Sequence, residues 1–307
     1  MAGRAVVTGA FSYSGGAIAR RLLDRGLEVV SLSRRPAPTG HPLAGAVGCE
    51  RLQFEDGAQL ARALDGADVL YNTYWIRFPR RGATFGQAVR NSQILFRAAG
   101  RAGVGRIVHL SVTNPSIDSP YTYFRGKAEV ERVLAETTSE HAVVRPSLVF
   151  GGREEILINN IAWLLRRLPL YAVPGDGRYR VQPVFVADVA ELAVAAGERS
   201  GPSTEDAAGP EVYQFDEFLT VLASALGARS RLVHLPPPVV VALGRALGPL
   251  LRDVLITSEE LGALTSELLV SHEPATGHTS FAEWLPGAAG WLGRRYANEL
   301  RRNWSGR

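Results

Sequence analysis

The sequence predicts an α/β protein with a doubly wound parallel sheet and a smaller, helix-rich C-terminal lobe. Three observations support this prediction. Apolar runs typical of buried strands alternate with helical patterns through the first half of the 307 residues. A turn rich in glycine and serine lies between the first strand pattern and the first helix pattern. Beyond Gly151 the alternation gives way to a pattern dominated by helices, so the two halves are expected to fold as separate lobes.

The expected elements of the first half follow one another without a break in the alternation. Strands are expected at residues 5–7, 27–32, near 51–54, at 69–73, 106–110 and 141–145, and helices after Gly16 and at 57–64, 85–102 and 123–136. The carboxyl ends of parallel strands share one edge of the sheet, where ligands bind. Residues at such ends include Gly9, Ser33, Thr73, Ser111 and Ser147.

The second half is expected to form a lobe of residues 151–183 and 201–307, while 184–200 returns to the domain of residues 1–150. Helices are expected at 156–168 and 189–197, a short strand at 184–186, and a strand with a helix within 209–227. The three prolines at 236–238 begin another helix, since proline is tolerated in a first helical turn. Arg245 interrupts the apolar run 239–251, which favours a packed helix over a membrane span.

Composition narrows the class of protein. With 46% hydrophobic and 21% charged residues the chain is typical of a soluble globular protein, and no segment offers the roughly 20 apolar residues of a membrane span. The N-terminus enters a strand directly, so we expect no signal peptide and a cytoplasmic location. Cys49 is the single cysteine and the six histidines are scattered, which predicts neither a disulfide nor a metal site. The net charge is +4, and the arginines occur as scattered pairs rather than as one basic cluster. We therefore expect no nucleic-acid partner.

The glycine-rich turn has the context of a dinucleotide-binding turn. Gly9 and Gly15 stand six positions apart with Ser12 midway, so the spacing departs from the usual G-x-G-x-x-G. Gly9 suits the tight turn, Gly15 or Gly16 suits a close approach of helix to strand, and the Ser12 hydroxyl suits a phosphate oxygen. The N–H groups at the start of such a helix favour an anion. The alternative is a strand–helix turn that binds nothing.

Lys127 is the second feature that points to chemistry. Of the 34 basic residues, 33 are arginine and only this one is lysine. Tyr123 precedes it by four positions, so both side chains lie on one face of the expected helix. A neighbouring ammonium group stabilises a phenolate, which suits acid–base catalysis, and Ser111 at a strand end is placed to hold a substrate oxygen. The alternative is an ordinary pair on the helix surface.

Six segments in this order resemble the short-chain dehydrogenase/reductase superfamily. They are TGAFSYSGG at 8–16, NSQILFRAA at 91–99, HLSVTNPS at 109–116, YFRGK at 123–127, RPSLVFG at 145–151 and QPVFVADVA at 182–190. The chain is most similar to extended and atypical members, namely epimerase/dehydratase-like proteins and relatives of the respiratory complex I 39-kilodalton subunit. The resemblance implies a Rossmann-type NAD(P)-binding domain.

The resemblance also implies roles for single residues. Ser111, Tyr123 and Lys127 would form the catalytic triad, with Tyr123 the acid–base group and Lys127 also holding the nicotinamide ribose. The remaining cofactor contacts would come from Gly9, Phe11, Ser12, Tyr13, Gly15, Thr73 and Pro146. The resemblance gives weaker support for a role of Asn91 in the site, because buried asparagines often only tie backbone segments together.

The end of the second strand indicates the cofactor. It reads Ser33-Arg34-Arg35, whereas NAD-binding proteins place a carboxylate about 20 positions after the first glycine. Serine and arginine accommodate a 2′-phosphate that a carboxylate would repel. We therefore expect NADP(H) to be preferred, with NAD(H) as the alternative.

The substrate is left open. The sequence Val181-Gln182-Pro183 stands where nucleotide-sugar epimerases have R-D-F, which disfavours a nucleotide sugar unless Arg178 or Arg180 takes over. By position, the candidate pocket residues are Tyr74, Trp75, Phe150, Asn159 and Arg180.

The expected function is an NADP(H)-dependent oxidoreductase or epimerase/dehydratase-like enzyme acting on a small carbonyl or hydroxyl compound. The alternative is a non-catalytic NADP(H)-binding protein, either an accessory subunit or a redox sensor. By analogy with the family, helices 85–102 and 123–136 are the candidate faces of a homodimer.

Overall fold

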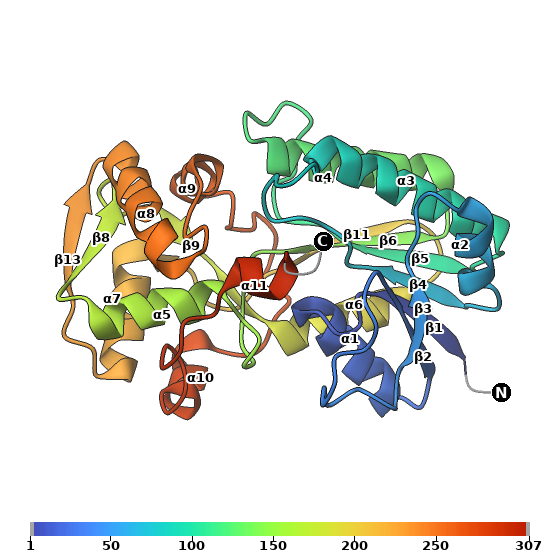
Figure 1. Ribbon diagram of the computed structural model, residues 1–307, viewed down its shortest axis with the longest axis horizontal. Coiled ribbons are helices and arrows are strands. Elements are labelled where there is room, and N and C mark those ends of the chain that lie inside the picture. Colours follow the sequence, from blue (N-terminus) through green and yellow to red (C-terminus); the bar gives the residue numbers. More distant parts are fainter. Residues whose placement is uncertain (1–2, 305–307) are drawn as a thin grey trace. The chain divides into compact units, whose positions relative to one another are not determined.

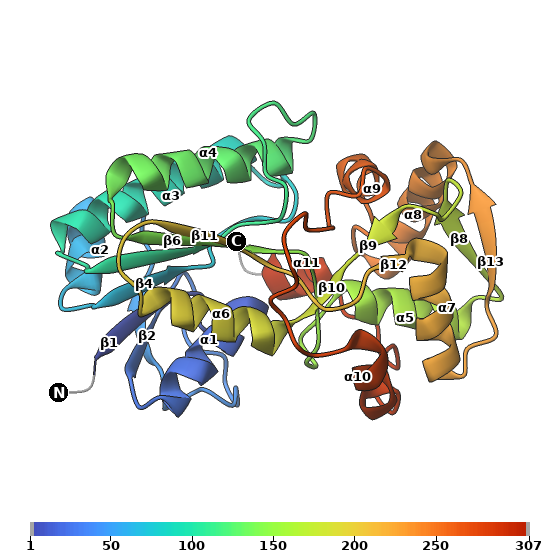
Figure 2. The same ribbon diagram turned by 180° about the vertical axis from the view of Figure 1, so that it is seen from behind.

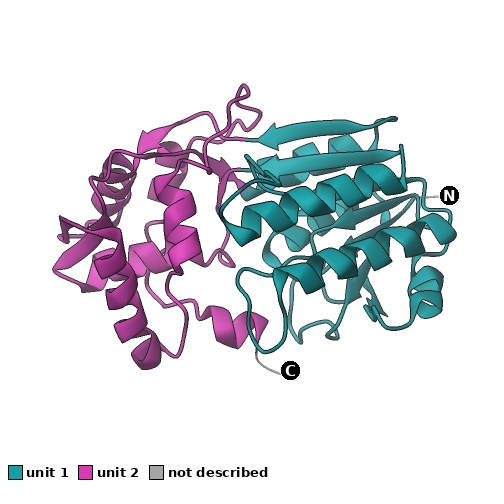
Figure 3. Cartoon of the chain, turned by 90° about the horizontal axis from the view of Figure 1, so that it is seen from above, with its two compact units in different colours: residues 1–146, 186–207 teal, residues 147–185, 208–307 magenta. Residues whose placement is uncertain are grey.

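The structure is a computed structural model that describes residues 3–304 (Figure 1). The chain forms two compact units, which Figure 3 colours separately. Unit 1 comprises Met1–Pro146 and Val186–Ala207, and unit 2 comprises Ser147–Phe185 and Ala208–Arg307.

Unit 1 is built on a parallel sheet of seven strands within the described residues, in the order β11-β6-β5-β4-β1-β2-β3. The strands are β1 (Arg4–Thr8), β2 (Glu28–Ser33), β3 (Gly48–Arg51), β4 (Val69–Asn72), β5 (Arg106–Leu110), β6 (His141–Pro146) and β11 (Ser203–Ala207). Both neighbours of β1 pair with it in parallel, and the strand order reverses there. The predicted fold class, a doubly wound parallel sheet, is confirmed.

Helices cover both faces of this sheet, as Figures 1 and 2 show from opposite sides. Helices α1 (Tyr13–Asp24) and α6 (Val186–Gly197) pack against each other, while α3 (Phe85–Arg101) packs against both α2 (Gly57–Leu64) and α4 (Thr122–Thr137). The main core lies between the sheet and α2–α4, where Leu70, Leu95 and Phe96 are fully buried. The apolar positions of α3 recur at helical spacing, so its one apolar face is buried.

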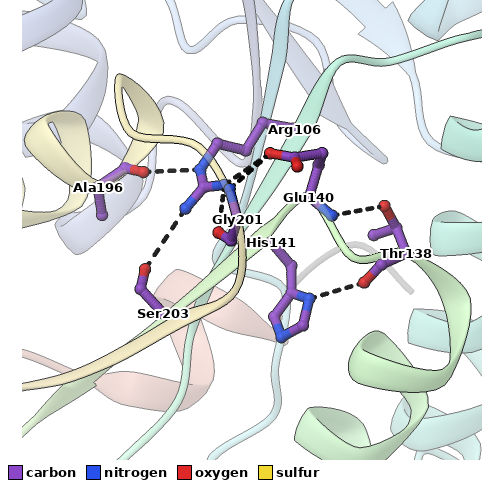
Figure 4. Close-up of polar contacts among 7 residues, drawn as sticks. All are labelled: Arg106, Thr138, Glu140, His141, Ala196, Gly201 and Ser203. Atoms are coloured by element: carbon purple, nitrogen blue, oxygen red, sulfur yellow. Dashed lines mark hydrogen bonds and ion pairs between the residues drawn. The ribbon is translucent and has the colours of Figure 1, made fainter.

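Arg106 ties the returning segment of unit 1 to the sheet (Figure 4). Its buried guanidinium donates hydrogen bonds to the carbonyl oxygens of Ala196 at 2.8 Å and Gly201 at 2.7 Å. It also contacts the Glu140 carboxylate at 3.3 Å. A buried charge is tolerated only when it is paired and hydrogen-bonded, so these partners fix the end of α6 and the approach to β11, which pairs with β6.

Unit 2 combines short strand pairs with helices. Its strands pair as β7 (Leu148–Phe150) with β10 (Pro183–Phe185), β8 (Leu170–Pro174) with β13 (Arg231–Leu235), and β9 (Arg180–Val181) with β12 (Tyr213–Gln214). Its helices are α5 (Leu157–Arg167), α7 (Phe215–Leu226), α8 (Pro237–Leu251), α9 (Ser258–Thr265), α10 (Phe281–Ala288) and α11 (Glu299–Asn303). Aromatic side chains, among them Phe218 and Phe281, fill its core.

Two expectations differ from the structure. β3 covers Gly48–Arg51 rather than a stretch near 51–54, because all four of its residues are exposed and the strand is defined by pairing with β2. No alternation of apolar and polar residues therefore marks it in the sequence. Helix α8 is only partly packed: Val241 and Gly248 are buried, whereas Val239, Leu243 and Leu250 are exposed.

Candidate functional site

The glycine turn joins β1 to α1 within unit 1. Gly9 has a φ of +68°, a left-handed conformation that favours glycine, and its N–H donates to the carbonyl oxygen of Leu32 at 3.0 Å. A Cβ added to Gly15 would lie 2.3 Å from the carbonyl oxygen of Gly9. Only glycine at position 15 therefore allows the helix to approach this close to the turn.

The start of α1 offers an anion-binding end. Ser12 is its N-cap residue and makes no side-chain capping hydrogen bond, and the first turn of the helix holds no acidic residue. The first N–H groups of a helix have no partner within the helix and carry the positive end of its dipole. Phe11 lies half-buried in the same turn, with its ring edge-on to His41 at 5.1 Å, and Tyr13 is the first residue of α1.

A buried polar network lies at the ends of the three central strands. The Thr73 N–H donates to Oγ1 of Thr8 at 2.7 Å, and Oγ1 of Thr73 donates to the carbonyl oxygen of Thr8 at 2.5 Å. Oγ1 of Thr8 also lies 3.2 Å from Oδ1 of Asn72, and Nδ2 of Asn72 lies 3.1 Å from Nδ1 of His109. The network fixes the end of β1, from which the glycine turn begins, against β4 and β5.

His109 is a member of this network that the sequence analysis overlooked. Its side chain is fully buried, and burial holds its pKa well below the usual range, with the charge of Lys127 acting in the same direction. The ring is therefore neutral at ordinary pH. Among the described residues its Nε2 atom has no hydrogen-bond partner.

The end of β2 is a cationic edge. Oγ of Ser33 accepts a hydrogen bond from the N–H of Arg35 at 3.2 Å. The Arg34 guanidinium carbon lies 5.2 Å from the centre of the Phe54 ring and 5.9 Å from that of Tyr74. Arg51 on β3 is the register partner of Ser33 and is exposed, so it adds an arginine that the sequence analysis did not include.

Ser111 and Lys127 come together at the end of β5. Nζ of Lys127 donates to the carbonyl oxygen of Leu110 at 2.7 Å, one residue before Ser111. The lysine is 3% exposed, so it is not an ordinary helix-surface residue. Burial lowers the pKa of Lys127 to about 7, against an opposing effect of the Glu131 carboxylate. Oγ of Ser111 is buried and has no partner among the described residues.

Tyr123 lies in the first turn of α4 and is half-buried. Its ring stands edge-on to Trp75 at 5.9 Å and to Phe85 at 5.8 Å. Trp75 in turn faces Lys127, whose Nζ lies 4.8 Å from the centre of the indole. Thus one indole ring contacts both members of the Tyr-x-x-x-Lys pair.

Two other expected residues of unit 1, Pro146 and Tyr74, lie at or just after the end of a strand. Pro146 is buried at the end of β6, and its carbonyl oxygen accepts a hydrogen bond from the N–H of Thr113 at 3.1 Å. The Tyr74 hydroxyl accepts a hydrogen bond from Nδ2 of Asn91 at 2.8 Å. Asn91 therefore fixes an aromatic side chain.

In unit 2 the structure gives the other expected pocket residues structural roles. Phe150 is fully buried, with ring centres 5.0 Å from Phe281 and 5.2 Å from Trp284. Oδ1 of Asn159 accepts from the N–H of Gly293 at 3.0 Å, and its Nδ2 donates to the carbonyl oxygen of Arg295. Packing and backbone hydrogen bonds occupy the side chains of Phe150 and Asn159, and their assignment to a substrate pocket stays a prediction.

Arg180 forms an exposed ion pair. Its Nη2 atom contacts Oε2 of Glu267 at 2.6 Å, and its backbone N–H donates to Oε1 of the same carboxylate at 2.9 Å. A substrate anion would compete with this carboxylate for the guanidinium.

Within residues 3–304, no three or more histidine, cysteine, aspartate or glutamate side chains are grouped as metal ligands. In the same part of the chain no helix has the length and apolar character that crossing a bilayer requires.

Comparison with known proteins gives relatives that include a subunit of NADH dehydrogenase and a steroid dehydrogenase. The chain is 25% identical over 285 residues to the Arabidopsis thaliana protein named NADH dehydrogenase (ubiquinone) 1 alpha subcomplex subunit 9, mitochondrial, covering 87% of this chain and 71% of that protein. It is also 25% identical over 276 residues to a 3-beta-hydroxysteroid dehydrogenase of Mycolicibacterium neoaurum, covering 80% of this chain and 71% of the relative.

The fold has a counterpart among solved structures. The triphenylmethane reductase of Citrobacter superposes with a TM-score of 0.76 at 15% identity, covering 94% of this chain and 99% of that one. Residues 5–208 match the family model described as NAD dependent epimerase/dehydratase. This match spans most of the chain, and the chain therefore belongs to the NAD dependent epimerase/dehydratase family.

Proposed function

We propose that this chain is an NADP(H)-dependent oxidoreductase that acts on a small carbonyl or hydroxyl compound. The observation that carries the proposal is the arrangement of Ser111 and Lys127 at the end of β5. The Ser111 hydroxyl, which is buried and has no partner within residues 3–304, lies next in the chain to the carbonyl that holds a buried ammonium group. Most buried polar groups have a hydrogen-bond partner, and a catalytic role is one reason for a group to lack one.

The residues of the glycine turn fit a dinucleotide. Gly15 lets the start of α1 approach the turn closely, and the first turn of α1 carries no competing carboxylate. These residues would hold the pyrophosphate, as helix N-termini do in this fold. When bound, the nicotinamide ring supplies or accepts the hydride.

The protein's own groups handle the substrate oxygen and its proton. The Ser111 hydroxyl donates a hydrogen bond to this oxygen and thereby orients it. Tyr123 donates a proton to the oxygen when the carbonyl is reduced, and removes it in the reverse direction. The ammonium group of Lys127 stabilises the negative charge that develops on the phenolic oxygen.

The experiment is a fluorescence titration of the purified protein with NADPH and NADH, followed by NADPH oxidation with a panel of aldehydes, ketones and quinones. The proposal expects tighter binding of NADPH and turnover of at least one compound. Arg34→Ala should reduce the NADPH preference by about tenfold or more, because a charge-assisted hydrogen bond contributes about 1.5–3 kcal/mol. Equal affinities in the unmutated protein would contradict the NADP(H) assignment.

A second candidate is a non-catalytic NADP(H)-binding subunit of a larger assembly. It is favoured by the Arabidopsis thaliana relative, which is named as a subunit of NADH dehydrogenase. Tight NADPH binding without turnover of any compound in the panel, together with unchanged affinity in Tyr123→Phe, would support this candidate over the enzyme.

A further inference from the structure

We infer that Phe54 and Tyr74 form an aromatic platform that positions Arg34 for the 2′-phosphate of NADP(H). The two rings would thus be specificity-determining residues of the cofactor site, and Tyr74 would serve the cofactor rather than a substrate pocket. This inference rests on the proposed function and deepens it, because it assigns new residues to the choice between two dinucleotides.

The platform consists of two rings below one cation. The ring centres of Phe54 and Tyr74 are 5.0 Å apart with an interplanar angle of 53°. The Arg34 guanidinium carbon lies 5.2 Å and 5.9 Å from these centres. Phe54 is only 6% exposed and belongs to the main core of unit 1, whereas Arg34 is exposed. A flexible surface arginine is therefore held against a buried ring.

A chain of hydrogen bonds holds Tyr74 in its orientation. Nδ2 of Asn91 donates to the Tyr74 hydroxyl at 2.8 Å, and Oδ1 of Asn91 accepts from Nε2 of Gln87 at 2.8 Å. The backbone N–H of Tyr74 donates to Oδ1 of Asn72 at 3.2 Å. Asn91 is 3% exposed and lies on α3, so the ring is anchored to a helix as well as to the end of β4.

This arrangement suits recognition of a phosphate. A guanidinium held near aromatic rings by its charge retains the fork of N–H donors that matches phosphate oxygens. Attraction between the cation and the rings also restricts the long side chain before a ligand binds, which reduces the entropy lost on binding. NAD(H) has a hydroxyl in place of the 2′-phosphate, so it gains little from a positioned cation.

The test measures affinity for two nucleotides that lack the nicotinamide ring. Adenosine 2′,5′-bisphosphate and 5′-AMP differ only in the 2′-phosphate, and isothermal titration calorimetry gives the ratio of their affinities. The variants are Arg34→Ala, Phe54→Leu, Tyr74→Leu and Tyr74→Phe, the last of which keeps the ring. Phe96→Leu is the matched control, since Phe96 is a fully buried ring of the same core whose ring contact is with His109.

We expect the parent to prefer the bisphosphate. The preference should fall about three- to tenfold in Phe54→Leu and in Tyr74→Leu, in line with the strength of cation–ring attraction. It should be kept in Phe96→Leu and should fall less in Tyr74→Phe than in Tyr74→Leu, because phenylalanine keeps the ring but loses the hydrogen bond from Asn91. In the Arg34→Ala background the further change Tyr74→Leu should have no effect on the preference, since the two residues act through one contact.

The outcomes separate this inference from the proposed function. A bisphosphate preference that Arg34→Ala removes but both leucine variants keep overturns the platform and leaves NADP(H) binding intact. Equal affinities of the parent for the two nucleotides overturn the platform and the NADP(H) preference, while dinucleotide binding stands. Failure to bind NADPH, NADH and both nucleotides overturns the proposed function and the platform together. If Phe54→Leu fails to fold, the affinity ratio of Tyr74→Leu alone tests the platform.

Discussion

The ammonium nitrogen of Lys127 lies 4.8 Å from the centre of the Trp75 ring and donates a hydrogen bond to the carbonyl oxygen of Leu110 at 2.7 Å. An aromatic face and a carbonyl dipole thus surround a buried positive charge. Both favour the charged form, whereas burial opposes it, and burial has the larger effect because the pKa falls to about 7.

The first prediction is that Lys127 titrates near pH 7 and that Trp75 raises its pKa. Because the sequence has one lysine, protein grown with isotope-labelled lysine gives a single side-chain NMR signal to follow with pH. Trp75→Leu removes the aromatic face and should lower the pKa relative to Trp75→Phe, which keeps one. A midpoint near 10 in the parent would show that the ammonium group is hydrated, and would contradict the buried position.

The second prediction concerns stability and pH. The pKa of Lys127 is about 7 in the folded state and about 10.4 in the unfolded state. Between these values the unfolded state binds more protons, so the free energy of unfolding rises with pH, by at most about 1.4 kcal/mol per pH unit. Below about pH 7 both states are protonated and this contribution stops changing.

The measurement is denaturant unfolding of the parent and Lys127→Met at several pH values from 6 to 10. Other titrating groups are shared, so the difference between the two curves isolates Lys127. The stability of the parent relative to the variant should increase between pH 7 and pH 10. A constant difference over this range would mean that the lysine keeps its proton in the folded protein.

The sequence was sufficient to predict the elements that carry an apolar face or a short apolar run. The expected bounds of α2 and β5 agree with the structure, and those of α3 differ by one residue at its end. Helices α2 and α3 show apolar periodicity, and β5 is buried along its whole length. The exposed strand β3 and the short strands of unit 2, such as β9 and β12, are defined by pairing with distant segments. A local pattern does not contain that information.

The candidate site likewise contains residues that a local sequence pattern marks and residues that only contacts between distant segments reveal. Glycine spacing and a lone lysine are local signals, and they led to Gly15 and Lys127. The contacts of Phe54 with Arg34 and of His109 with Asn72 join segments that are 20 and 37 positions apart. Phe54 has the signature of an ordinary core residue, so only the folded structure reveals that a cation lies on its ring.

The third prediction tests the close approach in the glycine turn. Gly15→Ala places a Cβ 2.3 Å from the carbonyl oxygen of Gly9, a distance that forces the turn to move. We expect NADPH binding to be lost and the protein to be destabilised by more than about 2 kcal/mol, as in overpacked sites. Thermal unfolding and fluorescence titration measure the two effects.

Gly16→Ala is the control for this substitution. Gly16 lies in the same helix and is also buried, but its added Cβ would be 3.4 Å from the nearest atom, the carbonyl oxygen of Ala10. Both changes bring the same gain in helix propensity. Equal behaviour of the two variants would show that the approach at Gly15 does not shape the binding turn.

The fourth prediction is that removal of the Ser111 hydroxyl leaves the protein as stable as before, or more stable, while catalysis is lost. Oγ of Ser111 is buried without a partner in the described part of the chain, so Ser111→Ala removes a desolvated polar group that makes no compensating bond. We expect the free energy of unfolding to be unchanged or to rise by up to about 1 kcal/mol. If the hydroxyl binds the substrate oxygen, turnover should fall by about a hundredfold.

Ser31→Ala is the matched control, because it is the same change at another buried serine, which lies in β2. Oγ of Ser31 accepts a hydrogen bond from the N–H of Ala10 at 3.1 Å, so the variant leaves a buried donor unsatisfied and should lose about 1–3 kcal/mol of stability. Denaturant unfolding of both variants is compared with turnover of any compound that the parent reduces. A Ser111→Ala protein as unstable as Ser31→Ala would show that the hydroxyl supports the fold. A Ser111→Ala protein with full turnover would remove Ser111 from the reaction. Stability kept and turnover lost is the combination expected of a group whose partner arrives with the substrate.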